Sequence, residues 1–240
     1  VRTQVSDAGL VHLQRLRKLQ ELQLSGTQVS DVGMESLKAF ADLRELSLAR
    51  TQVSDAGLEH LRALTRLERL RLDYTQVSDA GLMHLNRLRR LKSLSLGSTK
   101  VTDAGLKHLK GLTCLEWLYL GHTQISDTGL MHLEGLSKLE ALSLSGTQVS
   151  DAGLKHLKGQ SNLELLYLSD TQVSDAGLVH LNGLIRLQDL FLDHTQISDT
   201  GLEHIEKLTN LRMINLTSTQ VTEEGIQKLR HALPNCMILH

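Results

Sequence analysis

The chain has 240 residues, of which 22% are charged and 40% are hydrophobic, and its formal net charge is −1. This length corresponds to one large domain or two ordinary ones. The balanced charge argues against a nucleic-acid partner, because such proteins usually carry a clear basic excess. The sequence contains no apolar run of about 18 residues or more, so it predicts no membrane-spanning helix and no membrane partner.

The N-terminal residues Val1-Arg2-Thr3 already lie within a phrase, TQVSDAGL, that the chain uses repeatedly. They do not form a secretory signal peptide. We therefore expect the chain to be N-terminally incomplete, as a fragment of a longer protein or as a processed or engineered product. Its first strand, near residues 20–25, would then be an unpaired sheet edge that self-associates or is covered by another chain.

The phrase TQVSDAGL or a near-copy occurs ten times, always at an interval of 24 residues. A fixed period of about 20–50 residues is typical of a solenoid built from stacked units. A phrase that every unit needs serves the scaffold, so function is expected in the residues that vary between units. The threonines that open the copies are Thr3, Thr27, Thr51, Thr75, Thr99, Thr123, Thr147, Thr171, Thr195 and Thr219.

A representative unit contains two hydrophobic periods in succession. Leu70 and Leu72 alternate with polar residues, which is strand spacing. Leu82, Leu85 and Leu88 recur every three residues, which is helical spacing. Each unit is therefore predicted to be a short strand, a turn, a short helix and a return, and consecutive strands would form a parallel sheet.

The pair Ser78-Asp79 lies between the predicted strand and the predicted helix. These residues suit a helix N-terminus, where an oxygen accepts backbone N–H groups and a carboxylate meets the positive end of the helix dipole. We expect all the helices on the outer side of the sheet. A helix is about 10 Å across and strands lie about 4.8 Å apart, so stacking should curve the solenoid with the sheet on the concave side.

The segment Leu67-x-x-Leu70-x-Leu72 has the pattern LxxLxL and resembles the leucine-rich repeat. Nine such cores and the string VSDAGLxHLxxL are similar to the 24-residue variety found in many bacterial proteins and in F-box-associated repeats. The resemblance implies an α/β horseshoe of about nine to ten repeats, with a concave parallel sheet and convex short helices. It also implies a protein-binding role and no enzymatic activity. Threonine stands where the family commonly has asparagine or cysteine, and we expect its hydroxyl to bond the backbone of a neighbouring turn.

Two further columns of repeated residues are interpreted as structural. A glycine stands two residues after the acidic residue of the phrase in all ten units, from Gly9 to Gly225, and we expect the helix start to pack too closely there for a side chain. Helices of adjacent repeats should lie about 8–10 Å apart and Zn–N bonds are about 2.0 Å, so we predict no metal site from the histidine column. Each ring is instead expected to be partly buried and hydrogen-bonded to the next repeat. The column comprises His12, His60, His84, His108, His132, His156, His180 and His204.

The sequence predicts neither catalysis nor a disulfide. Ser, Asp and His recur in nearly every unit, whereas a nucleophile is needed once, so we expect no enzyme and no cofactor. Cys114 and Cys236 lie about five repeats apart, roughly 24 Å at strand spacing, which exceeds the separation of about 7 Å that a disulfide allows. Two free thiols favour a reducing compartment such as the cytoplasm.

Residues beside the strand leucines alternate with them and should point out of the concave sheet. The chain has one Trp, three Tyr and two Phe, and five of these six residues occupy such outward positions. Exposed aromatic side chains are typical anchors of protein interfaces. The five are Tyr74, Trp117, Tyr119, Tyr167 and Phe191.

The charged residues at the outward positions change sign along the chain, from arginines in early repeats to aspartates in late ones. A partner would meet a basic end, an aromatic middle flanked by histidines and an acidic end, which sets orientation as well as affinity. The predicted partner-binding set therefore adds to the five aromatic residues Arg69, Arg71, His122, Asp170, Asp189, Asp193 and His194.

The last unit departs from the others at Glu223-Glu224, Lys228 and Pro234. Terminal repeats need a more polar outer side, and proline does not extend a central sheet. We interpret about residues 219–240 as a C-terminal cap and residues 1–240 as a single solenoid domain.

The sequence thus predicts a recognition scaffold that binds a protein or peptide on its concave sheet face. One alternative is a designed or consensus repeat scaffold without a natural partner, which the letter-for-letter copies suggest. Another is the substrate-targeting arm of a larger enzyme. The irregular outward residues favour recognition over design, because a design would repeat them too.

Overall fold

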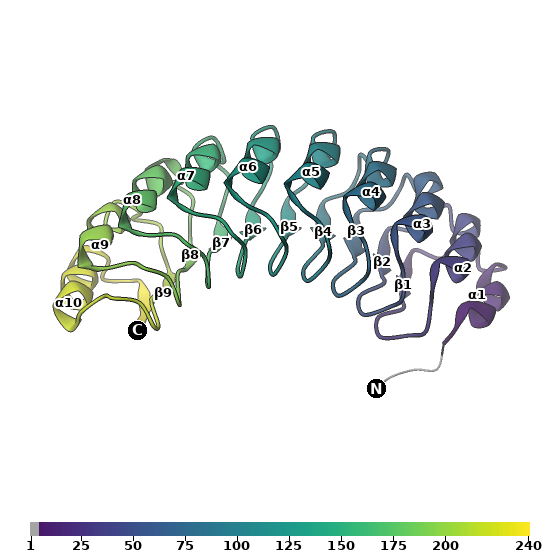
Figure 1. The fold of residues 1–240 in the computed structure, drawn as a ribbon, viewed down its shortest axis with the longest axis horizontal. Coiled ribbons are helices and arrows are strands. Elements are labelled where there is room, and N and C mark those ends of the chain that lie inside the picture. Colours follow the sequence, from purple (N-terminus) through teal and green to yellow (C-terminus); the bar gives the residue numbers. More distant parts are fainter. Residues whose placement is uncertain (1–4) are drawn as a thin grey trace. The chain divides into compact units, whose positions relative to one another are not determined.

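The computed structural model describes residues 5–240. Each repeat contributes one three-residue strand to the sheet (Figure 1). The strands are β1 (Glu21–Gln23), β2 (Glu45–Ser47), β3 (Arg69–Arg71), β4 (Ser93–Ser95), β5 (Trp117–Tyr119), β6 (Ala141–Ser143), β7 (Leu165–Tyr167), β8 (Asp189–Phe191), β9 (Met213–Asn215) and β10 (Met237–Leu239).

Between strands the chain forms short helices, and most of them continue from a single α-helical turn into a 3-10 turn. The α-helices are α1 (Asp7–Leu13), α2 (Asp31–Met34), α3 (Asp55–Leu58), α4 (Asp79–Leu82), α5 (Asp103–Leu106), α6 (Asp127–Leu130), α7 (Asp151–Leu154), α8 (Asp175–Leu178), α9 (Asp199–Ile205) and α10 (Glu223–Ala232). The 3-10 turns are η1 (Glu35–Ala39), η2 (Glu59–Ala63), η3 (Met83–Leu85), η4 (Lys107–Leu109), η5 (Met131–Leu133), η6 (Lys155–Leu157) and η7 (Val179–Gly183). A 3-10 helix has three residues per turn, which accounts for leucines spaced every three residues.

The chain divides into two compact units, the first ending at Leu118 and the second beginning at Tyr119. In the first unit β1 to β4 pair in parallel with a register of one repeat, so that Leu46 lies opposite Leu70. In the second unit β6 to β10 pair in the same way. Within each unit the helices lie along one side of the strands (Figure 1). The predicted parallel α/β solenoid of strand–helix repeats is confirmed, and the single domain over residues 1–240 stays a prediction.

The hydrophobic core lies between the strands and the helices of each unit. The two inward strand leucines of one repeat, Leu70 and Leu72, and the helix-side leucines Leu82, Leu85 and Leu88 are fully buried. Burying such a side chain contributes about 1.5–3 kcal/mol. The alternation of the strands therefore separates the core from the opposite sheet surface, which we call the strand face. It comprises the outward side chains of each strand and those of the second and third residues after it.

The repeated threonines are bonded differently from the prediction. Thr75 Oγ1 donates to the carbonyl of Leu72 at 2.7 Å, and the other buried threonines do the same within their own repeats. The expected bond to a neighbouring turn is therefore wrong, because the short hydroxyl reaches only the strand end three residues before it. Adjacent repeats are joined instead by backbone bonds, such as Leu72 N–H to the Ser95 carbonyl at 2.8 Å.

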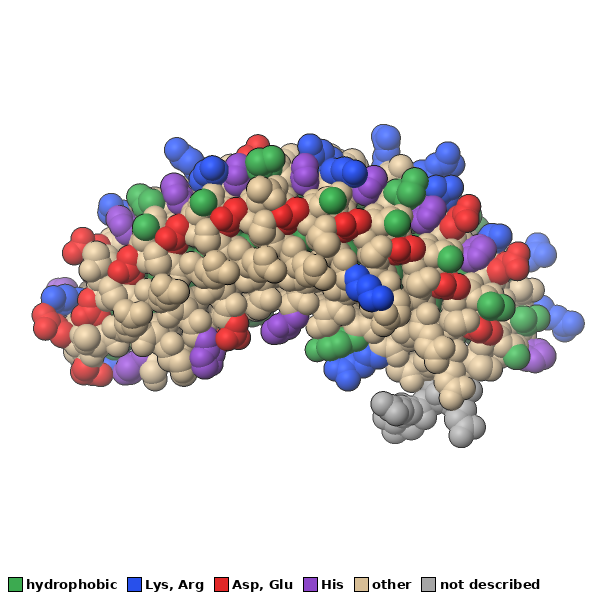
Figure 2. Space-filling model, viewed as in Figure 1, with side chains coloured by type: hydrophobic (Ala, Val, Ile, Leu, Met, Phe, Trp, Pro, Cys, Tyr) green, Lys and Arg blue, Asp and Glu red, His purple; other side chains and the backbone are tan. Residues whose placement is uncertain are grey.

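The Ser-Asp pairs link successive repeats instead of capping only their own helices. The Ser78 side chain makes no cap bond to α4. Its hydroxyl donates to Asp55 Oδ2 at 2.6 Å, and its backbone N–H donates to Asp55 Oδ1 at 2.7 Å. The same two bonds recur between further repeats, including those from Ser174 to Asp151. Within each unit the acidic side chains form an evenly spaced row below the helices (Figure 2).

The glycine column is confirmed as a site of close packing at Gly33 and at later positions, whereas a Cβ atom on Gly9 would meet only Val5 Cγ1, at 3.7 Å. A Cβ atom on Gly81 would lie 2.5 Å from Asp55 Oδ1 and 3.2 Å from the Asp55 Cα atom. The carboxylate that bonds Ser78 occupies the space that a side chain would need. The glycine and the Ser-Asp pair are thus parts of one repeated contact.

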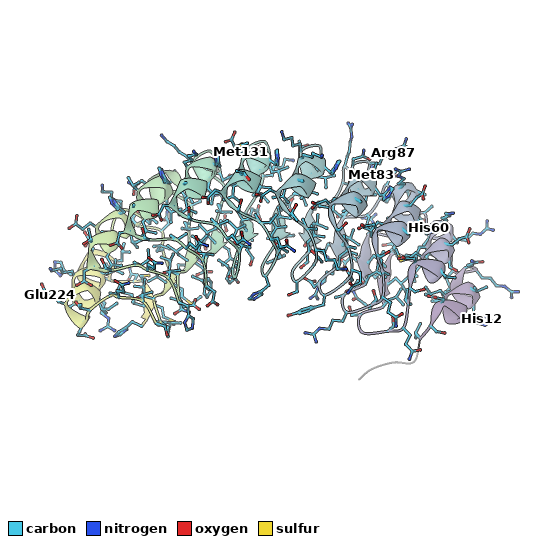
Figure 3. All side chains as sticks on the ribbon, viewed as in Figure 1. His12, His60, Met83, Arg87, Met131 and Glu224 are labelled. Carbon is cyan, nitrogen blue, oxygen red and sulfur yellow. The ribbon has the colours of Figure 1, made fainter. Side chains whose placement is uncertain are left out.

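The histidine prediction is confirmed at one position and wrong at others. His156 Nδ1 lies 2.6 Å from Glu134 Oε1 of the preceding repeat. The Nδ1 atoms of His60, His84 and His204 are buried without a hydrogen-bond partner among residues 5–240. His60 lies on the helix side of the first unit (Figure 3). Across the described part of the chain, no three His, Cys, Asp or Glu side chains gather as a group that could hold a metal ion.

The C-terminal segment re-enters the sheet. After Pro234 the chain forms β10, which pairs with β9 in parallel. The cap over about residues 219–240 stays a prediction. Among residues 5–240, no helix combines the length and apolar character that crossing a bilayer requires.

Candidate binding surface

The strand face of the first unit carries arginines that its own residues neutralise. Arg69 forms an ion pair with Glu45, and Arg71 Nε lies 3.6 Å from Asp73 Oδ2. The Arg50 guanidinium lies 4.5 Å from the centre of the Tyr74 ring. The predicted basic end is therefore present in composition, but its charges have partners within the unit.

Tyr74 is the most exposed of the five predicted aromatic residues, with 53% of its surface accessible. It has a φ of 56°, in the left-handed region. Trp117, Tyr119, Tyr167 and Phe191 are half-buried. All five lie outside the core, as predicted, but most of them are partly covered by neighbouring side chains.

Two predicted aromatic residues of the second unit pack against each other. Tyr167 on β7 and Phe191 on β8 are register partners, and their ring centres lie 4.4 Å apart with planes 17° from parallel. Burial, followed by the charges of Tyr119 and Asp189, raises the pKa of Tyr167. Asp189 lies two residues before Phe191 on β8, and Tyr119 lies two strands before Tyr167, so these four predicted residues share the strand face of the second unit.

The acidic side chains of the second unit differ in their surroundings. Asp193 Oδ1 accepts hydrogen bonds from Ser169 Oγ at 2.7 Å and from Asn215 Nδ2 at 2.9 Å. Within residues 5–240 the carboxylates of Asp170 and Asp189 form neither an ion pair nor a hydrogen bond that meets standard geometry. Two predicted aspartates thus present unneutralised charge.

His122 and His194 share a backbone conformation that the sequence analysis missed. Their φ angles are 56° and 57°, in the left-handed region that non-glycine residues rarely adopt. The same turn position holds Gly26 and Gly146, also with positive φ, and those glycines were the available signal. The His122 ring lies directly beside Gly146, where a Cβ atom would clash with it. The left-handed turn therefore recurs at the last strand-face position of successive repeats, including Tyr74 and Asp170.

The first unit also has a hollow outside the strand face. It has a volume of about 680 Å³ and lies against α1, α2 and η1 in the first unit. Its lining carries Asp7, Glu35 and Lys38 but neither histidine nor cysteine. Ser36, also in the lining, accepts a hydrogen bond from Gln14 Nε2 at 3.2 Å, and Lys38 Nζ lies 3.6 Å from Glu35 Oε1, so these polar side chains pair with one another.

Comparisons with known proteins agree with the repeat architecture. Residues 89–149 and residues 15–38 each match a family model described as leucine-rich repeat. No curated protein matches the sequence.

Solved structures similar to the chain include two internalins of Listeria monocytogenes. Internalin (inlF) has 26% sequence identity and a TM-score of 0.78, covering 95% of this chain and 68% of its own. Internalin C2 (inlC2) has 27% identity and a TM-score of 0.68, covering 86% of this chain and 83% of its own. A leucine-rich repeat protein of Leptospira interrogans, at 20% identity and a TM-score of 0.60, covers 95% of this chain and 74% of its own and supports the fold alone.

The repeat pattern, the strand–helix units and these matches agree with one another. Leucine-rich repeats generally serve as protein-interaction scaffolds and are generally non-enzymatic. The chain is a leucine-rich repeat protein.

Proposed function

We propose that the chain binds a protein or peptide partner on its strand face. The observation that carries this proposal is the placement of the aromatic side chains. Tyr167 and Phe191 stack on each other outside the core, beside an aspartate without a partner among the described residues. Aromatic residues at the centre of a surface are enriched among the residues that contribute most to binding.

The strand face suits a partner better than the helix side does. Its backbone is fixed by the parallel ladder, so aromatic side chains on it lose little freedom when a partner binds. The helix side carries single exposed apolar residues, such as Met131 and Val179, at 47% and 43% accessibility. Scattered apolar residues of this kind are normal on a surface.

The test compares a strand-face variant with a helix-side control. The chain is used as bait, a captured protein is purified, and its affinity is measured for the wild type, for Tyr167→Ala/Phe191→Ala and for Met131→Ala. We expect the double variant to lose at least about 2 kcal/mol of binding free energy, roughly a 30-fold change in Kd. Met131→Ala, which removes a comparable apolar side chain from the other side (Figure 3), should bind as the wild type does.

Thermal melting of the three proteins separates binding from folding. If the double variant stays folded and binds with unchanged affinity, the strand face is not the binding surface. If the helix-side change weakens the same partner instead, the surface lies on the helices.

A further inference from the structure

One row of side chains crosses the strand face of the second unit, and its members are large aromatic residues except for the small Ser143. Leu120 N–H donates to the Ser143 carbonyl at 2.9 Å, which places Tyr119 beside Ser143. Ser143 in turn lies opposite Tyr167, and Tyr167 lies opposite Phe191. The row therefore reads tyrosine, serine, tyrosine and phenylalanine on four successive strands.

The distance between Tyr119 and Tyr167 corresponds to that of two rings with one planar group stacked between them. Phe191 covers one face of the Tyr167 ring at a centre-to-centre distance of 4.4 Å, across one strand spacing. The opposite face is directed toward Ser143, whose side chain is too short to cover it. Tyr119 and Tyr167 are two strand spacings apart, about 9.6 Å. That separation equals about two stacking distances, so one planar group above Ser143 could contact both rings.

The charge around the row is acidic and is not compensated on the strand face. Between Ala141 and Ser218, the strand-face positions carry no lysine or arginine. Asp189 lies close enough to Tyr167 to raise the pKa of its hydroxyl, after burial and Tyr119. In the first unit, by contrast, Glu45 is paired with Arg69.

Among planar groups, the guanidinium of arginine fits both the stacking distance between the two tyrosines and the acidic charge of the strand face. It is flat, it stacks on aromatic faces, and its charge complements the aspartates. A phenylalanine or tryptophan of a partner would satisfy the spacing but not the charge. A lysine ammonium would satisfy the charge but is not planar.

We propose that the strand face above Ser143 receives an arginine side chain of a basic segment in a protein partner. The guanidinium lies between the rings of Tyr119 and Tyr167, and the carboxylates of Asp189 and Asp193 face the other basic residues of the segment. This inference rests on the proposed strand-face function and specifies the chemistry of the partner.

The experiment measures the affinity of fluorescein-labelled octa-arginine and octa-lysine, which carry equal charge. The wild type should bind octa-arginine roughly two- to fivefold more tightly, the range expected for one cation–π contact at an exposed site. Ser143→Leu fills the space between the tyrosines and should abolish this preference. Asp189→Asn should weaken both peptides by similar factors, because it removes charge and leaves the rings in place.

Ser93→Leu is the matched control, since Ser93 is a half-buried outward serine on β4 of the first unit. It should leave the preference for arginine unchanged. Tyr119→Leu provides a second variant that keeps apolar bulk but removes the planar ring, and it should also abolish the preference. Thermal melts of all variants check that they are folded.

Equal binding of the two peptides by the wild type would overturn the proposal. So would a folded Ser143→Leu or Tyr119→Leu variant that retains the preference for arginine. A captured partner that requires Tyr167 and Phe191 but binds Ser143→Leu normally would uphold strand-face binding and refute the arginine site. Preference of the wild type for a tryptophan-containing octapeptide over octa-arginine would assign the position to an aromatic side chain instead.

Discussion

Replacing Gly81 by alanine should destabilise the protein far more than a glycine-to-alanine change normally does. The added Cβ would lie 2.5 Å from Asp55 Oδ1, 3.0 Å from Leu58 Cδ1 and 3.2 Å from the Asp55 Cα atom. Because one of these neighbours is backbone, rotation of a side chain cannot relieve the whole overlap. Overpacking of this kind costs about 1–3 kcal/mol.

The same substitution also threatens the bonds between two repeats. The Asp55 carboxylate accepts from the Ser78 N–H at 2.7 Å and from the Ser78 hydroxyl at 2.6 Å. A hydrogen bond to a charged group contributes about 1.5–3 kcal/mol, so displacing the carboxylate adds to the steric cost. We expect Gly81→Ala to lower the free energy of unfolding by about 2–4 kcal/mol.

Gly111→Ala provides a control with the same chemistry. A Cβ atom at Gly111 would meet no heavy atom within 4 Å. Alanine there reduces the freedom of the unfolded chain and should leave stability unchanged or raise it by up to about 1 kcal/mol. Urea unfolding of the wild type and both variants measures the difference, and equal losses at the two sites would refute the role of the glycine column in repeat packing.

Three further predictions concern the core and the pH dependence of stability. Leu118→Ala, in the fully buried core, should lower the free energy of unfolding by about 2–5 kcal/mol. Thr123→Ala removes one hydrogen bond within its own repeat and should lower it by about 0.5–1.5 kcal/mol. Urea unfolding that ranks the two variants in the reverse order would contradict this prediction. Burial, followed by the charge of a nearby arginine, lowers the pKa of His84, so the unfolded chain binds the proton more readily and stability should fall as the pH drops through about 6.5. His84→Gln should flatten that part of a pH series of thermal melts, and an unchanged series would rule out this histidine as the cause. The side-chain and backbone hydrogen bonds of Thr222 lower the pKa of Asp199 below 3.8, so the stabilisation that they give is present above that pH and lost below it. Thr222→Val should therefore reduce the loss of unfolding free energy between pH 5 and pH 2, measured by urea unfolding at each pH.

The binding surface was predictable as a face but not as a set of contacts. Alternation along a strand places Tyr167 and Phe191 outside the core, and the fixed period brings them to adjacent strands. That Arg69 would be neutralised by Glu45 while Asp189 would not be paired depends on side-chain conformations, which the repeat pattern does not specify. The position of the short Ser143 side chain between Tyr119 and Tyr167 follows from the strand register.

The hydrogen-bond partners of the repeated threonines and serines were likewise not predictable from the sequence. A hydroxyl three residues after a strand leucine can reach the carbonyl of its own repeat or that of the next one, and the letters are the same in both cases. In the structure Thr75 bonds Leu72 of its own repeat. Ser78 instead bonds Asp55, which lies 23 residues earlier. Serine precedes aspartate by one position in the phrase, so a separation of 23 residues places the serine of one repeat against the aspartate of the preceding repeat.

The sequence by itself determined the 24-residue unit, the strand and helix within it, the buried leucines and the need for glycine at each helix start. These features follow from the hydrophobic periodicity within each unit and from the glycine that recurs at one position of every unit. Only the tertiary structure decided the partners of Thr75 and Ser78, the lack of a hydrogen-bond partner for His84 Nδ1 among residues 5–240, and the left-handed turn that carries His122 and His194. The physical reason is that the hydrogen bond of a polar atom depends on the neighbour that lies within about 3 Å of it, and in a solenoid that neighbour can belong to the adjacent repeat or to its own.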